Sequence, residues 1–253
     1  MFLAKKYSVT EYIKYSGMLS SFRDNLLVKE AVIVLSYFSI YILYSFLIPE
    51  ADYLHWFTLV LLPFGMLYLI QRKNLISPSF RLSLAFFGLR KNNLSKGILT
   101  AAIVGLLISI IQLITAGDLG IFWQLIDSGE ILYLFPVTFI LIVITVGFTE
   151  EFFFRGVLQT RISRLVNSNL LGIIVTSIMF GIYSIPYYYL AAANSNFTIW
   201  DPSILFVFGG GFLTGLLLGY VYLKSNENLL SCVILHSTIQ VLPMIMVIKS
   251  SWF

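Results

Sequence analysis

Long apolar stretches recur along this chain and limit what it can fold into more than any other feature does. A helix needs ~20 apolar residues to cross a hydrocarbon core of ~30 Å. Only 11% of the residues are charged, against about 25% in soluble domains. The sequence therefore predicts an all-α fold, a polytopic membrane bundle of about seven transmembrane helices. The apolar stretches are residues 31–48, 54–70, 97–116, 131–149, 170–190, 203–223 and 229–248.

The basic residues lie almost entirely on one side of such a bundle. If the N-terminus is inside, the inner segments hold every lysine and arginine except Lys249, an excess typical of cytoplasmic loops. We therefore expect an integral, multi-pass protein of a plasma membrane, with its N-terminus in the cytoplasm. The basic excess suits an anionic inner leaflet, so the lipid bilayer is the expected partner and nucleic acid is not. The inner segments are residues 1–30, 71–96, 150–169 and 224–228.

The chain is expected to form one membrane domain, residues 31–253, after a cytoplasmic or interfacial segment at 1–30. That segment mixes aromatic and basic residues, and residues 80–91 have an apolar and a basic side, so both are predicted amphipathic segments on the cytoplasmic side. Residues 117–130 and 191–202, rich in polar and turn-forming residues, are expected to be outer loops.

Three glycines in the sixth apolar stretch recur every four residues and therefore share one helix face. They are Gly211, Gly215 and Gly219. Small residues at this spacing allow two helices to approach closely in lipid, so the pattern predicts tight packing. The run of three glycines at 209–211 could also loosen the helix locally.

Two adjacent carboxylates, Glu150 and Glu151, stand at the end of the fourth apolar stretch. Ionisable groups at membrane depth are costly, which makes them candidates for function. Consecutive side chains diverge by ~100° on a helix, so the two can take different partners. Arg155 lies four residues beyond Glu151, where an ion pair is geometrically natural. Glu150 is then the freer carboxylate and the candidate general base. A helix end with interfacial charges is the plainer alternative.

His236 is the second ionisable group inside an apolar stretch. It is expected near the cytoplasmic start of the seventh span, level with Glu150, and Gln240 shares its helix face. A carboxylate, an imidazole and an amide at one depth could activate water and steady an oxyanion. A hydrogen-bonded core histidine is the alternative. The only other histidine, His55, is expected at the outer end of the second span, away from this group.

The chain resembles the CPBP family of membrane-embedded CAAX-protease and bacteriocin-processing proteins over about residues 80–245. The resemblance rests on three short motifs, two of which contain the residues just described. The first family motif, two glutamates, three residues and an arginine, is complete from Glu150 to Arg155. The third motif matches at His236, with Gln240 at its polar last position. In the second motif, Ser184 stands where the family has a histidine.

The resemblance implies an intramembrane endopeptidase of the metalloendopeptidase type, with a site that opens to the cytoplasm and cuts a membrane-proximal peptide. Glu150 would be the base, Glu151 and Arg155 its support, His236 a ligand or activator, and Gln240 the oxyanion donor. A zinc ion would be held by Glu150 and His236. These two residues are fewer than the three protein ligands that catalytic zinc normally has.

The serine at position 184 leaves two functions open. Ser184 can hold a water or donate a hydrogen bond, but it is a poor zinc ligand. The first function is an active peptidase with an altered site, in a bacterial plasma membrane, acting on a peptide or membrane-protein substrate. The second is a catalytically degenerate homologue that binds or scaffolds a membrane partner or gives bacteriocin self-immunity.

Overall fold

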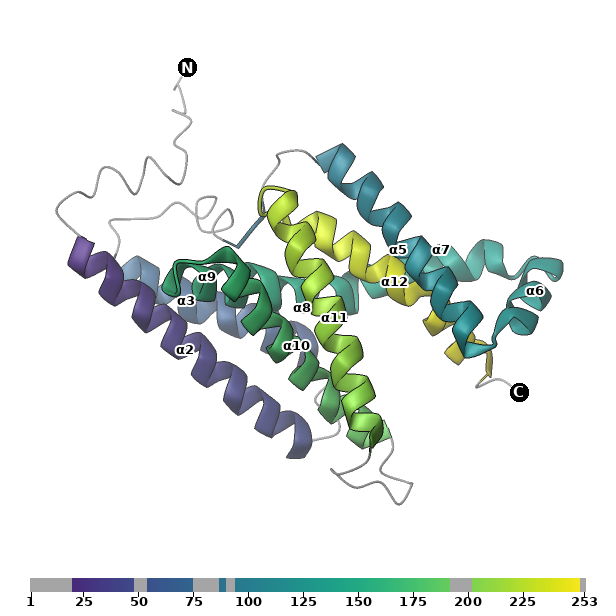
Figure 1. Ribbon diagram of the computed structural model, residues 1–253, viewed down its shortest axis with the longest axis horizontal. Coiled ribbons are helices and arrows are strands. Elements are labelled where there is room, and N and C mark those ends of the chain that lie inside the picture. Colours follow the sequence, from purple (N-terminus) through teal and green to yellow (C-terminus); the bar gives the residue numbers. More distant parts are fainter. Residues whose placement is uncertain (1–19, 48–53, 75–86, 90–93, 192–201, 251–253) are drawn as a thin grey trace.

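The computed structural model describes residues 20–47, 54–74, 87–89, 94–191 and 202–250. Within these ranges the chain is helical, without strands, apart from residues 87–89 and the short turns between helices (Figure 1). This confirms the predicted all-α class. The amphipathic segment at 80–91 lies mostly outside the described residues, as do residues 1–19 and most of the predicted loop at 191–202. The elements are α2 (Ser20–Leu47), η2 (Trp56–Leu61), α3 (Leu62–Asn74), α5 (Leu94–Ala116), α6 (Leu119–Asp127), α7 (Ile131–Ile142), η3 (Val143–Gly147), α8 (Phe148–Glu151), η4 (Phe152–Gln159), α9 (Thr160–Leu165), α10 (Asn169–Ala191), α11 (Pro202–Lys224) and α12 (Leu229–Ser250).

Six helices of the described chain, rather than seven, are long and apolar enough to cross a membrane. The second apolar stretch instead forms a shorter helix, Trp56–Gln71. At ~1.5 Å per residue this helix is roughly 24 Å long, which is less than the thickness of the hydrocarbon core. The protein is therefore an integral, multi-pass helical bundle with one short apolar helix among its long ones.

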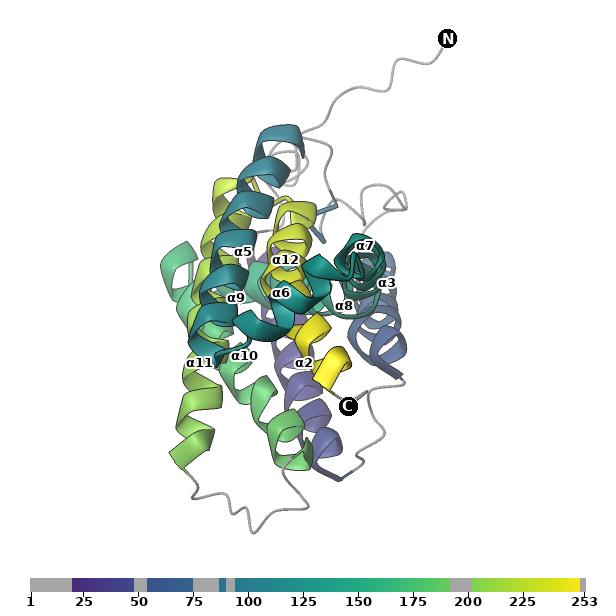
Figure 2. The same ribbon diagram turned by 90° about the vertical axis from the view of Figure 1, so that its right-hand side faces the viewer.

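The helices run alternately up and down, as the order of apolar stretches predicts. Figure 1 shows the starts of α2 and α5 near the turns that follow α9 and α11, at one end of the bundle. The end of α2, the end of α10 and the start of α11 lie at the opposite end. Figure 2, turned by 90°, shows the short α6 beside α12, on the side of the molecule that faces the viewer.

The helix that carries the two glutamates does not end there. Residues Ile131–Leu165 form one apolar helical run of 35 residues, from α7 through α9. The prediction that the fourth span ends at residue 149 is therefore wrong, and residues 150–165, predicted to be part of an inner segment, belong to this helix. Glu150, Glu151 and Arg155 stay helical because they pair inside the bundle instead of reaching water at its edge. The π-helical turns η3 and η4 flank α8, and such turns are frequent at functional sites.

The predicted outer loop at 117–130 contains a helix of its own, α6. Its Leu125 is fully buried among side chains of α7 and α12, and this apolar anchor explains why the segment folds as a helix. Short turns remain at each side, with positive φ at Gly117 and Gly129.

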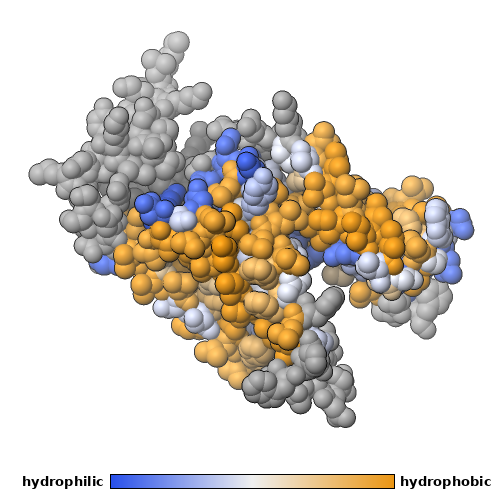
Figure 3. Space-filling view, viewed as in Figure 1, coloured by the Kyte–Doolittle hydropathy of each residue, from blue (hydrophilic) through white to orange (hydrophobic). Residues whose placement is uncertain are grey.

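Apolar side chains cover most of the described surface, as expected of a protein that faces lipid. Figure 3 shows them over α2, α10, α11 and α5, whereas hydrophilic residues gather near α9 at one end. Hydrophilic residues also show in the notch between the α10–α11 pair and the arm formed by α7 and α12. Many polar side chains are instead buried, including Glu150 and Glu151.

The three evenly spaced glycines pack closely against neighbouring helices, which confirms the prediction made for them. A methyl group added at Gly215 would lie 2.9 Å from Ser177 Cα of α10, and one at Gly211 would lie 3.0 Å from Gly181 Cα. A methyl group at Gly219 would meet Gln159 of η4 and Ile173 of α10 at 3.0 Å. Helix α11 nevertheless remains helical through residues 209–211.

Gly215→Ala is expected to destabilise the bundle by about 1–3 kcal/mol, because the new methyl group meets backbone that cannot rotate away. The measurement is denaturant unfolding in detergent micelles. Gly209→Ala is the matched control, since an added methyl group there meets nothing within 4 Å. Equal stability of the two variants would contradict the close approach of α10 and α11.

Candidate functional site

Glu151 lies at the centre of a buried cluster and is held from two sides. Its Oε2 accepts a hydrogen bond from Arg155 Nε at 3.0 Å, which is the predicted i,i+4 ion pair. Its Oε1 lies 2.8 Å from His236 Nδ1 of α12. Glu151 and Arg155 are 0% exposed and His236 is 1% exposed. Both carboxylate oxygens of Glu151 are thus committed, and it serves to orient its two partners.

The contacts of His236 define its tautomer when the ring is neutral. A carboxylate can only accept, so Nδ1 carries the hydrogen that it donates to Glu151. Nε2 then has a lone pair and accepts a hydrogen bond from Gln240 Nε2 at 2.8 Å. The amide nitrogen of Gln240 has two hydrogens, so the second remains for another acceptor. This chain of contacts connects Glu151, through the imidazole, to the part-buried amide of Gln240.

Glu150 makes contacts different from those of its neighbour. Its Oε1 accepts a hydrogen bond from the Tyr183 hydroxyl of α10 at 3.1 Å. Its Oε2 faces His236 Nε2 at 3.8 Å, beyond hydrogen-bond distance. The carboxylate is 8% exposed. Glu150 is therefore the carboxylate with an oxygen uncommitted to a hydrogen bond within the described part of the chain.

His55 also reaches this group, which overturns the expectation that it lies away from the cluster. Its Nε2 is 2.8 Å from the Tyr183 hydroxyl, the same group that hydrogen-bonds Glu150. Two differences from the predicted helix positions bring His55 and Glu150 close together. The helix of η2 and α3 is short, so its first turn lies inside the bundle, and Glu150 lies in the middle of a long helix and not at its end. Trp56 stacks on Phe148 of α8, with ring centroids 5.2 Å apart, and holds the two elements together.

Ser184, the remaining predicted site residue, does not join the cluster. Its hydroxyl donates to the Phe180 carbonyl of its own helix at 3.1 Å. The side chain points toward α11, where its Oγ would meet a methyl group added at Gly211 at 2.6 Å. The structure thus brings together Glu150, Glu151, Arg155, His236 and Gln240 and leaves Ser184 beside α11. Tyr183, its neighbour in the second motif, contacts Glu150 in its place. Tyr183 was not among the predicted site residues, although it lies next to one of them.

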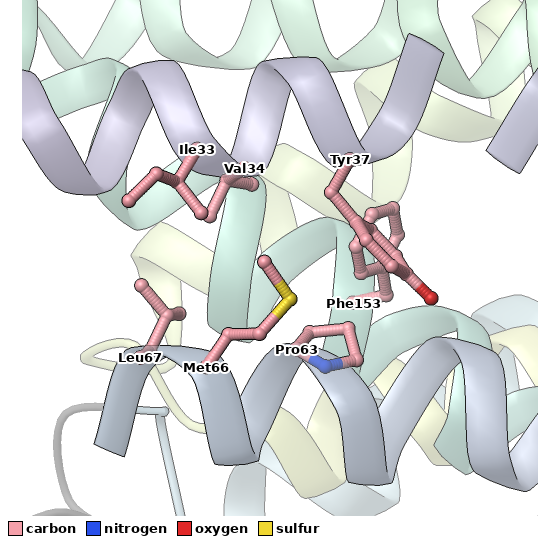
Figure 4. Close-up of a pocket in the computed structure, with 7 residues that line it drawn as sticks. All are labelled: Ile33, Val34, Tyr37, Pro63, Met66, Leu67 and Phe153. Atoms are coloured by element: carbon pink, nitrogen blue, oxygen red, sulfur yellow. The ribbon is translucent and has the colours of Figure 1, made fainter. Parts of the chain in front are cut away.

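The three phenylalanines between Glu151 and Arg155 enclose the cluster in apolar packing. Phe154 meets the rings of Phe180 and Tyr183 at centroid distances of 4.8 and 5.1 Å. Phe153 lines a gap between α2 and α3 (Figure 4). That gap is lined by apolar side chains and Tyr37, whose hydroxyl donates to the Thr58 carbonyl. The gap is therefore a packing defect behind the motif and offers no reactive group.

The cluster does not fit a catalytic zinc ion. Both His236 nitrogens already have hydrogen-bond partners, and both oxygens of Glu151 are held by Arg155 and His236. Within the described ranges, no three histidine, cysteine, aspartate or glutamate side chains are grouped so that they could hold a metal. Zinc normally takes three protein ligands at a catalytic site. The arrangement instead suits a carboxylate base beside an imidazole and an amide.

Comparison with known families identifies the segment that carries this cluster. The family model described as type II CAAX prenyl endopeptidase Rce1-like matches residues 132–242. This segment belongs to the Rce1-like family. The match confirms the CPBP-family resemblance and covers the cluster from Glu150 to Gln240, whereas His55 lies outside it. No curated protein and no solved structure matches the chain. At the level of the family, the Rce1-like segment is that of a CAAX-type intramembrane protease.

Proposed function

We propose that the protein is an intramembrane endopeptidase that cleaves a membrane-proximal peptide with a water molecule activated by Glu150. One observation carries the proposal. Glu150 Oε2 is the carboxylate oxygen of the cluster that makes no hydrogen bond to the described residues, and it faces an imidazole 3.8 Å away. A general base needs a lone pair that is buried, oriented and not already used.

The reaction follows from these positions. Water gives its proton to Glu150 Oε2 as its oxygen forms a bond to the scissile carbonyl carbon. The second hydrogen of the Gln240 amide supports the oxygen that becomes negative, as an oxyanion-hole donor does. The carbon–nitrogen bond then breaks, and the proton held by Glu150 passes to the leaving amine. Glu150 returns to its carboxylate form, and no other reactant is consumed.

Glu151, Arg155 and His236 act as positioning residues in this proposal. Arg155 balances the charge of Glu151, and Glu151 fixes the ring of His236 through Nδ1. His236 in turn directs the Gln240 amide. The site needs this support because an amide or imidazole that can rotate loses much of its value in stabilising a transition state.

The orientation of the site is part of the proposal. The basic residues of the inner segments support a site that opens to the cytoplasm. The membrane proposed is a bacterial plasma membrane. Arg155 and Arg161 no longer contribute to that support, because both are buried. The substrate class proposed is a peptide anchored near the membrane surface, such as a lipidated C-terminus or a bacteriocin precursor.

The proposed activity is tested by incubating the purified protein in lipid nanodiscs with matched lipidated and unlipidated peptide libraries. We expect cleavage of membrane-bound peptides, detected by mass spectrometry. Retention of a peptide without any cleavage would favour the degenerate, partner-binding alternative, which the displaced Ser184 supports.

Metal removal is expected to leave cleavage within about twofold of the untreated rate, because the nitrogens of His236 and the oxygens of Glu151 already have partners within the protein. The measurement is the cleavage rate before and after dialysis against 1,10-phenanthroline, with metal content determined in parallel. A zinc metallopeptidase assayed alongside is the control for effective chelation. Loss of activity that returns on adding zinc would contradict the metal-independent mechanism.

A further inference from the structure

We infer, on the basis of the proposed function, that His55 and Tyr183 position Glu150 and supply the second histidine that is absent at Ser184. The three residues form a continuous chain of hydrogen bonds: His55 Nε2 to the Tyr183 hydroxyl at 2.8 Å, and that hydroxyl to Glu150 Oε1 at 3.1 Å. His55 is the N-cap residue of η2, far from the family motifs in sequence and outside the matched segment.

The directions of these hydrogen bonds follow from the groups themselves. A carboxylate of Glu150 accepts only, so the single hydroxyl hydrogen of Tyr183 points to Oε1. The Tyr183 oxygen must then accept from His55, whose Nε2 carries a hydrogen. His55 thereby orients the hydroxyl, and the hydroxyl holds Oε1. The other oxygen, Oε2, is the one left to act as base.

Two histidines consequently act on the two oxygens of one carboxylate. His236 of α12 faces Oε2 directly, and His55 acts on Oε1 through Tyr183. In the family arrangement implied by the resemblance, the second histidine would stand at position 184, on α10. Here α10 supplies Tyr183, one residue earlier, and a different element supplies the imidazole. The tyrosine ring spans the extra distance.

Aromatic packing holds the His55–Tyr183 pair in this position. The Tyr183 ring stacks on Tyr41 of α2, with centroids 6.1 Å apart, and meets Phe154 edge-on. Next to His55, Trp56 stacks on Phe148. The hydroxyl of Tyr183 is therefore fixed by rings on both α2 and the motif helix, which a freely rotating surface tyrosine would not be.

The first test is independent of activity. The chain has two histidines, so protein labelled with ¹⁵N-histidine gives signals from two rings, and the His55→Gln variant assigns them. Glu150→Gln is expected to shift the His55 ring nitrogens as well as those of His236. In a Tyr183→Phe background, Glu150→Gln should still shift His236 but no longer His55. An unchanged His55 spectrum in Glu150→Gln would overturn the inference.

The second test measures cleavage. Tyr183→Phe is expected to lower kcat by about 10- to 100-fold with KM unchanged, the range expected when a hydrogen bond to a charged group is lost. His55→Leu, which removes a hydrogen bond to a neutral hydroxyl, should lower kcat by about 2- to 10-fold. Combining the two should cost little more than Tyr183→Phe alone, because both act through the same series of hydrogen bonds. His55→Gln, whose amide nitrogen can donate from a similar position, should recover most of the rate. Independent, multiplicative losses would overturn the inference.

The two tests separate this inference from the proposed function. Coupled histidine signals and non-additive kcat losses together support it. Active enzyme without coupling overturns the role of His55 and leaves the function of Glu150 standing. Coupled signals in a wild-type protein that cleaves no peptide refute the proposed function, and the chain of hydrogen bonds is then structural only.

Discussion

Glu150→Gln is expected to lower peptide cleavage by about 10²- to 10⁴-fold, the range of a general base. The amide keeps the shape of the side chain and can still accept from the Tyr183 hydroxyl, so the fold should be retained. It cannot, however, take a proton from water. The measurement is the initial rate of cleavage of a peptide identified in the nanodisc assay, under single-turnover and multiple-turnover conditions.

The matched control is Glu130→Gln, which changes a glutamate at the start of α7 that pairs with Lys249, on another part of the molecule. Its rate should stay within about twofold of the wild type, since surface ion pairs contribute little. Cleavage by Glu150→Gln at a rate close to that of Glu130→Gln would rule out Glu150 as the base. A lowered unfolding midpoint in the Glu150 variant would point to a structural role instead.

Arg155→Met is expected to destabilise the protein by about 3–5 kcal/mol, the second large effect. Removal of the guanidinium leaves the carboxylate of Glu151 buried without its cation, and such a loss of one partner is costly. The double variant Glu151→Gln with Arg155→Met should recover part of the stability, because it removes both charges. Equilibrium unfolding in mixed micelles measures all three proteins.

Lys249→Met is the control for this experiment, because it breaks an ion pair whose partners are 16% and 30% exposed. Exposed pairs contribute about 0–1 kcal/mol, so this variant should unfold close to the wild type. If Arg155→Met lost no more stability than Lys249→Met, the buried ion pair would not hold the motif helix together.

Features that depend on residues close in sequence were predictable here. Glu151 and Arg155 form their ion pair because side chains four residues apart meet on any helix. Gly211 and Gly215 face α10 for the same reason, since their spacing alone places them on one side of α11. The membrane class likewise follows from the apolar stretches, which need only length and composition to be recognised.

The position of the charged residues along the bundle was harder to predict, because the ends of the helices were placed wrongly. The apolar stretch ends at residue 149, yet the helix continues to Leu165. Glu151 pairs with Arg155 inside the protein, and Glu150 accepts a hydrogen bond from Tyr183 of another helix. Hydropathy treats each charge as if it must reach water. It cannot register a charge whose partner is supplied by a neighbouring turn or by another helix.

The sequence by itself determined the helical membrane class, the Rce1-like motifs and the local pairing of Glu151 with Arg155. Only the tertiary structure decided which groups surround Glu150. His236 reaches the motif from α12, and His55 reaches it through Tyr183. Both contacts depend on how α12, α10 and the η2–α3 helix are offset along their axes from the helix that carries the motif. Those offsets arise from the short η2–α3 helix and from ring packing between residues distant in sequence. The spacing of residues within one helix therefore cannot predict the offsets.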